Sequence, residues 1–440
     1  MKPVLLLLIA LICATNVHAA VGQEEQIGSL VIMGGSERFR NREIWEEIRE
    51  LAGGAGAKVA VIPTACTEPI KDTRRVLTTL EKFDLEPFLV PMANKGFEMT
   101  AAECAKDPEW VRKVRNADCV FFVGGRQDRI VDALILPNGE KSPMLEAIWS
   151  VYRSGGVVAG TSAGAAIMSH FMYRDGPNPL AAMKNGVKLG KELGAGLGFL
   201  DHDWFVDQHA LVRGRFARTI AAMHSLDLEY GIGVDENTAL IVEDGKRARV
   251  VGHKGVLLLK LSEAKRDPVI KTFNLKNVQL SYLDQGDSID LVTHKVTPAD
   301  EKMDDQLLDP NDDSYDPYYN HRMFYADILG NCVVPDLLGR LIDNKQSEAI
   351  GLAFNAGDAA NEPSDGYEFR FYRGKDSIGW FTTDYGGEDY TVLNIHLDIK
   401  PIRITGPLYT HYQQMEAEME AMEADMAAGL SAADRKPDSD

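Results

Sequence analysis

Short, uniformly apolar runs alternate with helix-like patterns over the first part of the chain. The apolar runs occupy residues 29–33, 58–63, 85–90, 119–123 and 157–159. Between them, apolar residues recur at helical spacing, as Ile44, Ile48 and Leu51 do. Strands without polar alternation, joined by helices, are typical of a parallel sheet that is buried on both faces. The pattern therefore predicts an α/β fold with a mostly parallel sheet and helices on both faces.

From about residue 225 the apolar runs become shorter and the turns between them tighter. Further strands are predicted at residues 232–234, 239–242, 248–251 and 256–259, with two more between 273 and 296. Residues 297–320 are acidic and rich in turn-forming residues, which is typical of a linker or an exposed loop. Residues 321–408 combine a helical patch with further strands. They predict a C-terminal accessory unit that is mixed α/β or β-rich.

The last part of the chain carries a stripe of methionines. Met415, Met419, Met422 and Met426 follow one another at spacings of four, three and four residues. This spacing predicts an amphipathic helix that docks on another surface, and it leaves a homodimer open. Residues 409–440 are therefore predicted to form this helix and a polar tail, and residues 27–296 to form a catalytic domain.

The N-terminus has the pattern of a secretory signal peptide. Lys2 precedes an apolar run over residues 4–14, and Val17-His18-Ala19 matches a small-residue cleavage site. The run is too short to span a bilayer, and no later stretch is apolar enough to do so. We therefore expect residues 1–19 to be removed after Ala19, leaving a secreted or periplasmic protein without a membrane segment.

Composition narrows the function classes. The 440 residues include 47 Lys and Arg against 66 Asp and Glu, which gives a formal net charge of −19. Such an acidic chain binds polyanions poorly, so a nucleic-acid-binding function is not expected. The five cysteines are widely spaced and form no CxxC pair. Neither a disulfide framework nor a metal site is predicted.

A candidate nucleophile follows the last apolar run. Residues 160–164 read Gly-Thr-Ser-Ala-Gly, a G-x-S-x-G sequence between a buried strand and a helix. This sharp turn exposes the hydroxyl of Ser162, and the amide of Ala163 becomes an oxyanion donor. Gly125, in the glycine pair after another predicted strand, is the candidate second donor. A tight helix-entry turn with a capping serine is the structural alternative.

A serine nucleophile needs a base, and the base needs an acid that orients it. His209 follows the apolar run at residues 204–206, and Glu236 follows the strand at residues 232–234. Because side chains at element ends can converge, the sequence predicts Ser162, His209 and Glu236 as a triad.

The order of the three residues separates two folds. An α/β-hydrolase has the order serine, acid, histidine, whereas this triad has the order serine, histidine, acid. His396 or His411 would supply a late histidine for the α/β-hydrolase alternative, but neither has a distinctive sequence context.

An arginine-rich segment follows the candidate base. Arg213 lies four residues after His209, and Arg215 and Arg218 lie three apart on a different helix face. Guanidinium groups bind carboxylates bidentately, so the cluster suggests an anionic substrate group. A solvated helix face with ion pairs is the alternative.

Four motifs in this order resemble cyanophycinases of the serine peptidase family S51, which have a class I glutamine-amidotransferase-like fold. They are GGRQ at residues 124–127, GTSAGA at 160–165, DQHALVRGRFAR at 207–218 and GIGVDENTA at 231–239. The resemblance covers about residues 27–296. G-x-S-A-G is shared with related aspartyl dipeptidases, whereas the run from Asp207 to Arg218 is more specific.

The resemblance implies both the site and the substrate. Ser162, His209 and Glu236 correspond to nucleophile, base and acid. The implied substrate-binding residues are Gln127, Asp207, Gln208, Arg213, Arg215 and Arg218. The implied substrate is cyanophycin, a poly-aspartate with arginine on each β-carboxyl, which is cleaved to β-Asp-Arg dipeptides without a cofactor.

The chain departs from the family pattern in three places. Arg126 stands where a smaller or acidic residue is expected, residues 132–142 form a longer segment, and residues after about 300 have no counterpart in the minimal enzyme. Because of the signal peptide, the chain resembles the exported form. The alternatives are a related S51 aspartyl dipeptidase or acidic-isopeptide hydrolase, another aspartyl-rich peptide as substrate, or a non-catalytic binding protein of the same fold.

Overall fold

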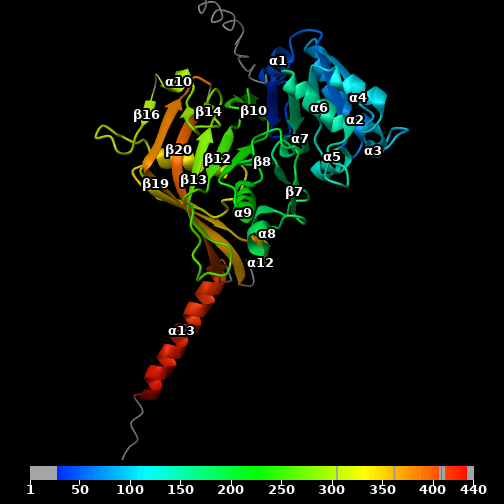
Figure 1. Cartoon of the computed structure of the whole chain (residues 1–440). Coiled ribbons are helices and arrows are strands. Elements are labelled where there is room, and N and C mark those ends of the chain that lie inside the picture. The colour runs from blue at the N-terminus through cyan, green and yellow to red at the C-terminus, as the bar shows by residue number, and fades with distance from the viewer. Residues whose placement is uncertain are drawn as a thin grey trace, which may run out of the picture.

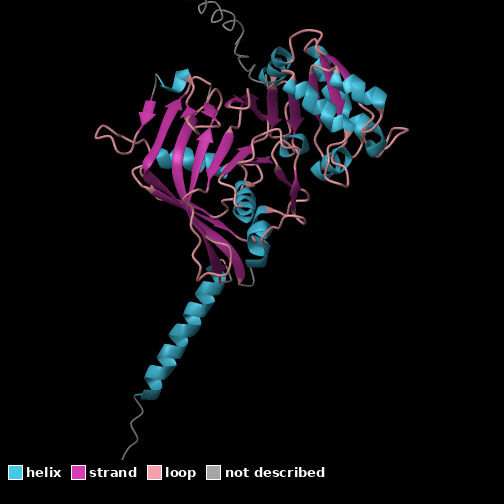
Figure 2. Ribbon diagram, viewed as in Figure 1, coloured by secondary structure: helices cyan, strands magenta, loops and turns pink. Residues whose placement is uncertain are grey.

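The computed structural model describes residues 27–303, 306–359, 363–385, 387–405, 408 and 412–433. The predicted signal peptide lies outside these residues. Two large sheets dominate the described chain, and Figure 2 shows them as two separate groups of strands. A short hairpin, β6 (Phe171–Tyr173) with β7 (Leu193–Ala195), lies outside both sheets.

The first sheet contains the predicted parallel strands. Their order across the sheet is β1 (Ser29–Met33), β5 (Val157–Thr161), β4 (Cys119–Phe122), β2 (Lys58–Ile62) and β3 (Glu86–Leu89). All four pairings among these strands are parallel. Beyond β1 the sheet continues with antiparallel strands: β10 (Thr238–Glu243), β11 (Arg247–Gly252), β14 (Ser288–Asp290) and β15 (Val296–Thr297).

Helices cover both faces of the parallel strands, as the apolar pattern predicted. Along β1, Leu30 and Ile32 face one core cluster, whereas Val31 and Met33 face another. The second cluster includes buried residues of α1 (Arg42–Leu51) and α2 (Pro69–Lys82). The first cluster is built with the remaining helices of this region: α3 (Ala101–Cys104), α4 (Pro108–Arg115), α5 (Gln127–Leu134), α6 (Pro143–Arg153) and α7 (Ala163–Ala166). The α/β fold class is therefore confirmed.

The second sheet is mostly antiparallel, and its buried residues divide between the first core cluster and a further cluster. Its order is β17 (Met323–Tyr325), β18 (Glu348–Ala353), β19 (Ser364–Thr382), β20 (Asp389–Ile404), β13 (Leu275–Leu283), β12 (Val256–Lys260), β9 (Tyr230–Val234) and β8 (Trp204–Gln208). β16 (Gln306–Leu308) pairs with β19. The helices near this sheet are α8 (Pro179–Asn185), α9 (Phe216–Leu226), α10 (Asp300–Met303), α11 (Val333–Ile342) and α12 (Ala356–Ala359).

The second sheet joins the predicted accessory unit to the predicted catalytic domain. β20 pairs with β13 between Val392 and Ile399, so residues 321–408 add strands to a sheet that begins within residues 27–296. The predicted linker also contains a buried residue, because Lys302 is 0% exposed and its ammonium group contacts Asp287 and Thr391. The predicted domain boundaries stay predictions. Residues 27–296 and 321–408 contribute side chains to the same core cluster.

The methionine stripe lies on α13 (Tyr412–Ala433), which projects away from the sheets in Figure 1. Its four methionines are exposed, so the predicted docking of this helix stays a prediction. Among the residues that the structure describes, no helix combines the length and the apolar character needed to cross a membrane.

Candidate active site

The candidate nucleophile occupies a sharp turn at the carboxyl end of a central parallel strand. Ser162 lies between β5 and α7 and has φ 52° and ψ −107°, a conformation that L-residues rarely adopt. The turn packs tightly on the neighbouring strand, since a Cβ on Gly164 would lie 2.5 Å from the carbonyl oxygen of Phe122. Glycine is therefore required at this end of the G-x-S-x-G motif.

The candidate base reaches the serine from the second sheet. His209 follows β8, and its amide donates to the carbonyl oxygen of Gly34 after β1 (2.9 Å). Its Nε2 lies 2.8 Å from Ser162 Oγ. The imidazole packs against Gly35, where a Cβ would lie 2.3 Å from His209 Cε1. The first glycine pair thus makes room for the histidine ring.

The candidate acid completes a hydrogen-bonded chain. Glu236 follows β9, and its Oε1 lies 2.6 Å from Nδ1 of His209. Nδ1–H donating to Glu236 leaves Nε2 as the acceptor for the serine hydroxyl. The structure thus brings together the three residues that the sequence predicted as a triad.

Burial and charge favour a neutral imidazole. His209 is 5% exposed, and burial, helped by the positive charge of Arg213, lowers its pKa to about 4 against the opposing effect of Glu236. Burial raises the pKa of Glu236, but its hydrogen bond with His209 and the charge of Arg213 outweigh this, so its pKa is lowered. Near neutral pH the pair is a neutral base beside a carboxylate, the state required for accepting a serine proton.

A second carboxylate fixes the loop that carries the histidine. Asp235 is fully buried, and its Oδ1 accepts hydrogen bonds from the amides of Leu211 (3.1 Å) and Val212 (3.0 Å). Its Oδ2 lies 3.9 Å from Sγ of Cys332, just before α11. The sequence shows two adjacent carboxylates. The structure shows that Glu236 contacts the His209 ring, whereas Asp235 contacts the loop after it.

Glu37 is a residue near the site to which the sequence gave no role. Its Oε1 accepts a hydrogen bond from the amide of Gly35 (2.8 Å), and its Oε2 accepts one from the hydroxyl of Thr161 (2.5 Å). Burial raises the pKa of Glu37. It links the glycine turn beside His209 to the residue before Ser162. Its position after Gly34-Gly35 was the only sequence signal.

The predicted arginine cluster divides into different environments. Arg218 forms a bidentate ion pair with Asp207, at 2.7 Å and 2.6 Å, and the two side chains are only 4% and 3% exposed. Burial raises the pKa of Asp207, but the charge and hydrogen bonds of Arg218 outweigh this and lower it. Thr219 donates a further hydrogen bond to Asp207 (3.1 Å). This pair is therefore closed off within the described chain.

Arg213 is the most accessible arginine of the run. Its side chain is 51% exposed, and one of its guanidinium nitrogens lies 3.6 Å from Glu236 Oε1. Arg215 is largely buried and donates to the carbonyl oxygen of Gln208 (2.8 Å) and to the Gln208 side chain. Gln127, at the start of α5, donates to the carbonyl oxygen of Tyr173 (2.7 Å). Of the predicted substrate-binding residues, Arg213 thus has the most free surface beside the triad.

The predicted oxyanion donors come from two segments near Ser162, the start of α7 and the glycine pair after β4 (Cys119–Phe122). Ala163 follows Ser162 directly, and a Cβ on Gly124 would lie 3.2 Å from Ser162 Cβ. Gly125 follows with φ 144°. Arg126, the unusual residue in this motif, forms an exposed ion pair with Asp128 (2.5 Å).

The alternative histidine, His396, contacts residues outside the triad. His396 lies on β20, where its ring contacts Asn277 (2.6 Å) and Asp376 (3.0 Å). His411 lies outside the described residues. Within the described ranges, no group of three or more His, Cys, Asp or Glu side chains is arranged to hold a metal ion.

Comparison with known proteins identifies the class of this chain. The family model for peptidase family S51 matches residues 30–250. These residues include the serine, the histidine and the glutamate of the hydrogen-bonded chain. The chain therefore belongs to peptidase family S51 and is a serine-type peptidase.

Its curated relatives include cyanophycinases. The cyanophycinase of Geminocystis herdmanii is 27% identical over 277 residues, which are 60% of this chain and 94% of that protein. The cyanophycinase of Thermosynechococcus vestitus is 28% identical over 276 residues, 61% of this chain and 81% of that protein. A crystal structure of a peptidase from an acI-B1 Actinobacterium is 22% identical with a TM-score of 0.45, covering 61% of this chain and 99% of that chain. The chain is thus a cyanophycinase-like S51 peptidase.

Proposed function

We propose that this chain is an exported serine exopeptidase that hydrolyses cyanophycin to β-Asp-Arg dipeptides. The observation that carries the proposal is the hydrogen-bonded chain from Ser162 Oγ through His209 to Glu236, at 2.8 Å and 2.6 Å. Nucleophile, base and orienting acid stand in the relation that acyl transfer requires. Membership of family S51 supports the same reaction class.

In the proposed mechanism, Ser162 Oγ attacks an aspartyl backbone carbonyl while His209 Nε2 takes its proton. The amides of Gly125 and Ala163 stabilise the oxyanion, an effect worth about 10²- to 10³-fold in rate for each donor. His209 then protonates the leaving amine, and an acyl-serine forms. Water, deprotonated by the same imidazole, releases the product and restores the serine. Glu236 stabilises the imidazolium that forms in each step.

One feature beside the triad supports an aspartyl substrate. Arg213 offers a half-exposed guanidinium group beside the triad, where it can pair with a substrate carboxylate. Gln127 and Gln208 are proposed to complete the substrate-binding set, with Arg215 placed near Gln208. The buried pair of Asp207 and Arg218 is proposed to act indirectly, by positioning the segment that carries His209.

Export is the remaining part of the proposal. It is supported by the sequence of residues 1–19, with cleavage after Ala19. A mature protein recovered outside the cytoplasm, with Ala20 as its first residue, is the expected result. N-terminal sequencing of the protein from the periplasm or medium tests this part without reference to activity.

The activity is tested by release of β-Asp-Arg from insoluble cyanophycin. The mature protein is compared with Ser162→Ala, and both are shown to have the same circular dichroism spectrum. Release by the wild type alone supports the substrate and the nucleophile together. Equal release by both proteins would contradict the role of Ser162. If neither acts on cyanophycin but the wild type cleaves aspartyl dipeptides, the related dipeptidase becomes the function.

A further inference from the structure

A pocket lies between the second sheet and α11, outside the triad. Its cavity volume is about 140 Å³. The lining residues come from β13 and the turn after it, from the segment before β17, from α11 and from the start of β20. They are Tyr282, Asp284, Tyr319, Pro335, Asp336, Gly339, Arg340, Glu388 and Tyr390. All of them lie beyond residues 30–250, which the family model matches.

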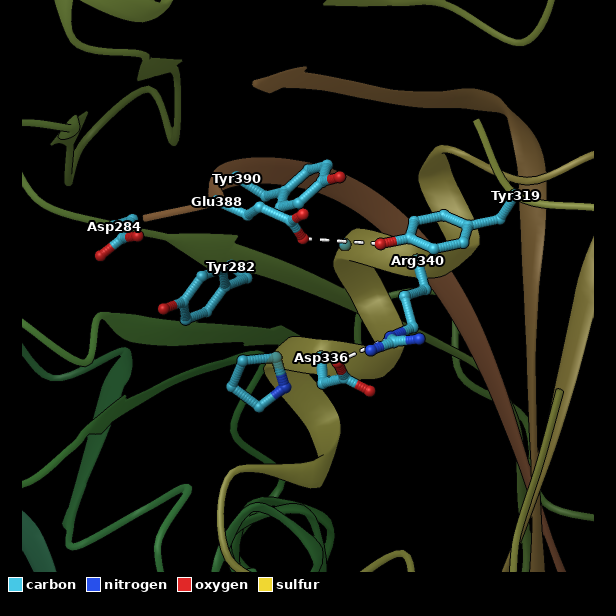
Figure 3. A pocket seen from close by; sticks show the side chains of 9 residues that line it. Tyr282, Asp284, Tyr319, Asp336, Arg340, Glu388 and Tyr390 are labelled. Atoms are coloured by element: carbon cyan, nitrogen blue, oxygen red, sulfur yellow. Dashed lines mark hydrogen bonds and ion pairs between the residues drawn. The ribbon is translucent and has the colours of Figure 1, made fainter. Parts of the chain in front are cut away.

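The pocket is lined by three carboxyl groups and one guanidinium group, and burial raises the pKa of one of them, Asp284, to about 7. Of its three carboxylates, only Asp336 has a cationic partner, since its Oδ1 accepts a hydrogen bond from Arg340 Nε (2.7 Å). Glu388 accepts only a long hydrogen bond from the Tyr319 hydroxyl (3.5 Å). Among the described residues, no cation forms an ion pair with Asp284 or Glu388, although the charge of Lys302 acts on Asp284 at longer range. The dashed lines in Figure 3 mark the two contacts that are formed.

Two polar atoms of residues that line the pocket lack hydrogen-bond partners among the described residues. Asp284 and Tyr282 are each only 7% exposed. One oxygen of Asp284 accepts from the amide of Gln285 (2.8 Å). Across the described part of the chain, the other oxygen and the Tyr282 hydroxyl make no hydrogen bond. Both residues line the cavity, so these two oxygens are free to accept hydrogen bonds from a ligand.

The aromatic lining of the pocket favours a flat cation that can stack on its rings. Tyr282, Tyr319 and Tyr390 place three phenol rings around the cavity, and Figure 3 shows Tyr282 and Asp284 on one side of it with Tyr319 and Arg340 on the other. A guanidinium group is flat, stacks on aromatic faces and donates up to five hydrogen bonds. Arg340 already does this within the pocket, with its guanidinium carbon 5.3 Å from the Tyr319 ring centre and its Nε on Asp336.

We propose that this pocket binds the guanidinium group of an arginyl side chain, as a docking site for the arginine-bearing polymer separate from Ser162. Asp284 and Glu388 supply the carboxylates, and the tyrosines supply the stacking surfaces. The polymer as the source of the arginine rests on the proposed function, whereas guanidinium binding does not. The accessory segment, through α11 and β20, would then hold an insoluble substrate near the enzyme.

Calorimetric titration of the full mature protein with agmatine tests the site without hydrolysis. Butylamine, which has the same charge but no flat group, is the comparison ligand. Glu388→Gln removes one exposed carboxylate and should weaken agmatine binding about 5-fold. Asp284→Asn should weaken it about 10-fold. Glu81→Gln, which changes an exposed carboxylate on α2, is the matched control and should bind as the wild type does.

Several outcomes would overturn the site. They are no agmatine binding by the wild type, equal binding by Glu388→Gln and wild type, or binding of butylamine as tight as that of agmatine. The Glu388→Gln protein keeps the test decisive if Asp284→Asn fails to fold, because Glu388 is exposed.

A sedimentation assay identifies the source of the arginine. Ser162→Ala protein is mixed with insoluble cyanophycin, with and without Glu388→Gln. A several-fold loss of bound protein in the double variant supports docking of the polymer. If Glu388→Gln weakens agmatine binding but leaves sedimentation unchanged, the polymer is not the ligand of this pocket, and a free guanidinium compound is. Failure of cyanophycin hydrolysis with agmatine binding intact would contradict the proposed function only.

Discussion

The two sheets contribute different parts of the candidate active site. The first sheet presents Ser162 at the end of a parallel strand, on a turn with φ 52°. The second sheet presents His209 and Glu236 after β8 and β9, two neighbouring strands that pair in parallel. Ser162 and His209 both have a φ angle of 52°, one in the turn between β5 and α7 and the other directly after β8. The hydrogen-bonded chain of the triad is complete only where the two sheets meet.

Backbone hydrogen bonds fix this meeting point. The amide of His209 donates to Gly34 (2.9 Å), and the amide of Asn237 donates to Gly35 (2.9 Å). The two glycines directly follow β1, which lies beside β5 in the first sheet. The loops after β8 and β9 are thus attached to the strand next to the nucleophile. Catalysis should depend on side chains across this junction more than on those within either sheet.

The largest effect is expected from breaking the junction at Glu236. Glu236→Gln keeps the shape but removes the carboxylate that orients His209 Nδ1–H (2.6 Å). We expect kcat/KM for β-Asp-Arg release to fall about 10³- to 10⁴-fold, since the imidazole loses its tautomer and the stabilisation of its charged form. Steady-state kinetics measure this, and Glu81→Gln on α2 is the control.

Retention of most of the activity by Glu236→Gln would mean that the acid is another residue. Asp235 is the nearest alternative in sequence, but it accepts its hydrogen bonds from two amides of the loop after His209. Asp235→Asn should therefore disturb the loop rather than the tautomer.

The next largest effect is on stability, and it distinguishes two arginines of the segment that follows β8. Arg218 is paired with Asp207 and 4% exposed, whereas the Arg213 side chain is 51% exposed. Arg218→Ala leaves a buried, unpaired carboxylate, and we expect it to lower the free energy of unfolding by about 3–5 kcal/mol. Arg213→Ala should change that free energy by no more than about 0.5 kcal/mol. Urea unfolding followed by circular dichroism measures both.

Equal stability of the two variants would contradict this division. Unchanged stability together with a raised KM in Arg218→Ala would instead make Arg218 a direct substrate ligand, as the family resemblance implied. The two measurements therefore decide whether this arginine holds the fold or the substrate.

The parallel half of the fold is readable from sequence because β1, β2, β4 and β5 are buried on both faces, with the edge strand β3 as the exception. The run at residues 29–33 coincides with β1 (Ser29–Met33), and four more runs coincide with or overlap strands of the same sheet. The second sheet is harder to predict, since β19 (Ser364–Thr382) and β20 (Asp389–Ile404) have half-exposed faces. The pairing of β20 with β13 joins distant residues, and no local pattern encodes it.

The site shows the same limit. Turn chemistry and element ends sufficed to predict that Ser162, His209 and Glu236 would meet. The sequence did not predict that Arg218 closes on Asp207, because partner choice depends on burial, nor that Glu37 contacts Thr161 across the turn. The Tyr282 pocket is drawn from four separate segments. Its residues had no common sequence signal.

The smallest expected effect concerns the pH dependence that Arg213 sets. The pKa of His209 is lowered to about 4, first by burial and then by the charge of Arg213. Because His209 must be neutral to accept the serine proton, kcat/KM should be constant at neutral pH and fall as the pH drops through about 4. Arg213→Gln removes one positive charge, so the imidazolium becomes less unfavourable and the pKa rises.

The acid limb of the Arg213→Gln profile should therefore lie at higher pH than that of the wild type. The difference in kcat/KM between variant and wild type should be smaller at pH values well above both limbs than on the limbs themselves. Arg115→Gln, on α4 away from the triad, is the matched control and should leave the limb unchanged. A uniform loss of kcat/KM at every pH would mean that Arg213 binds substrate without tuning the base. A limb that moves to lower pH would contradict the sign of the electrostatic argument, because the loss of a nearby positive charge can only favour the protonated imidazole.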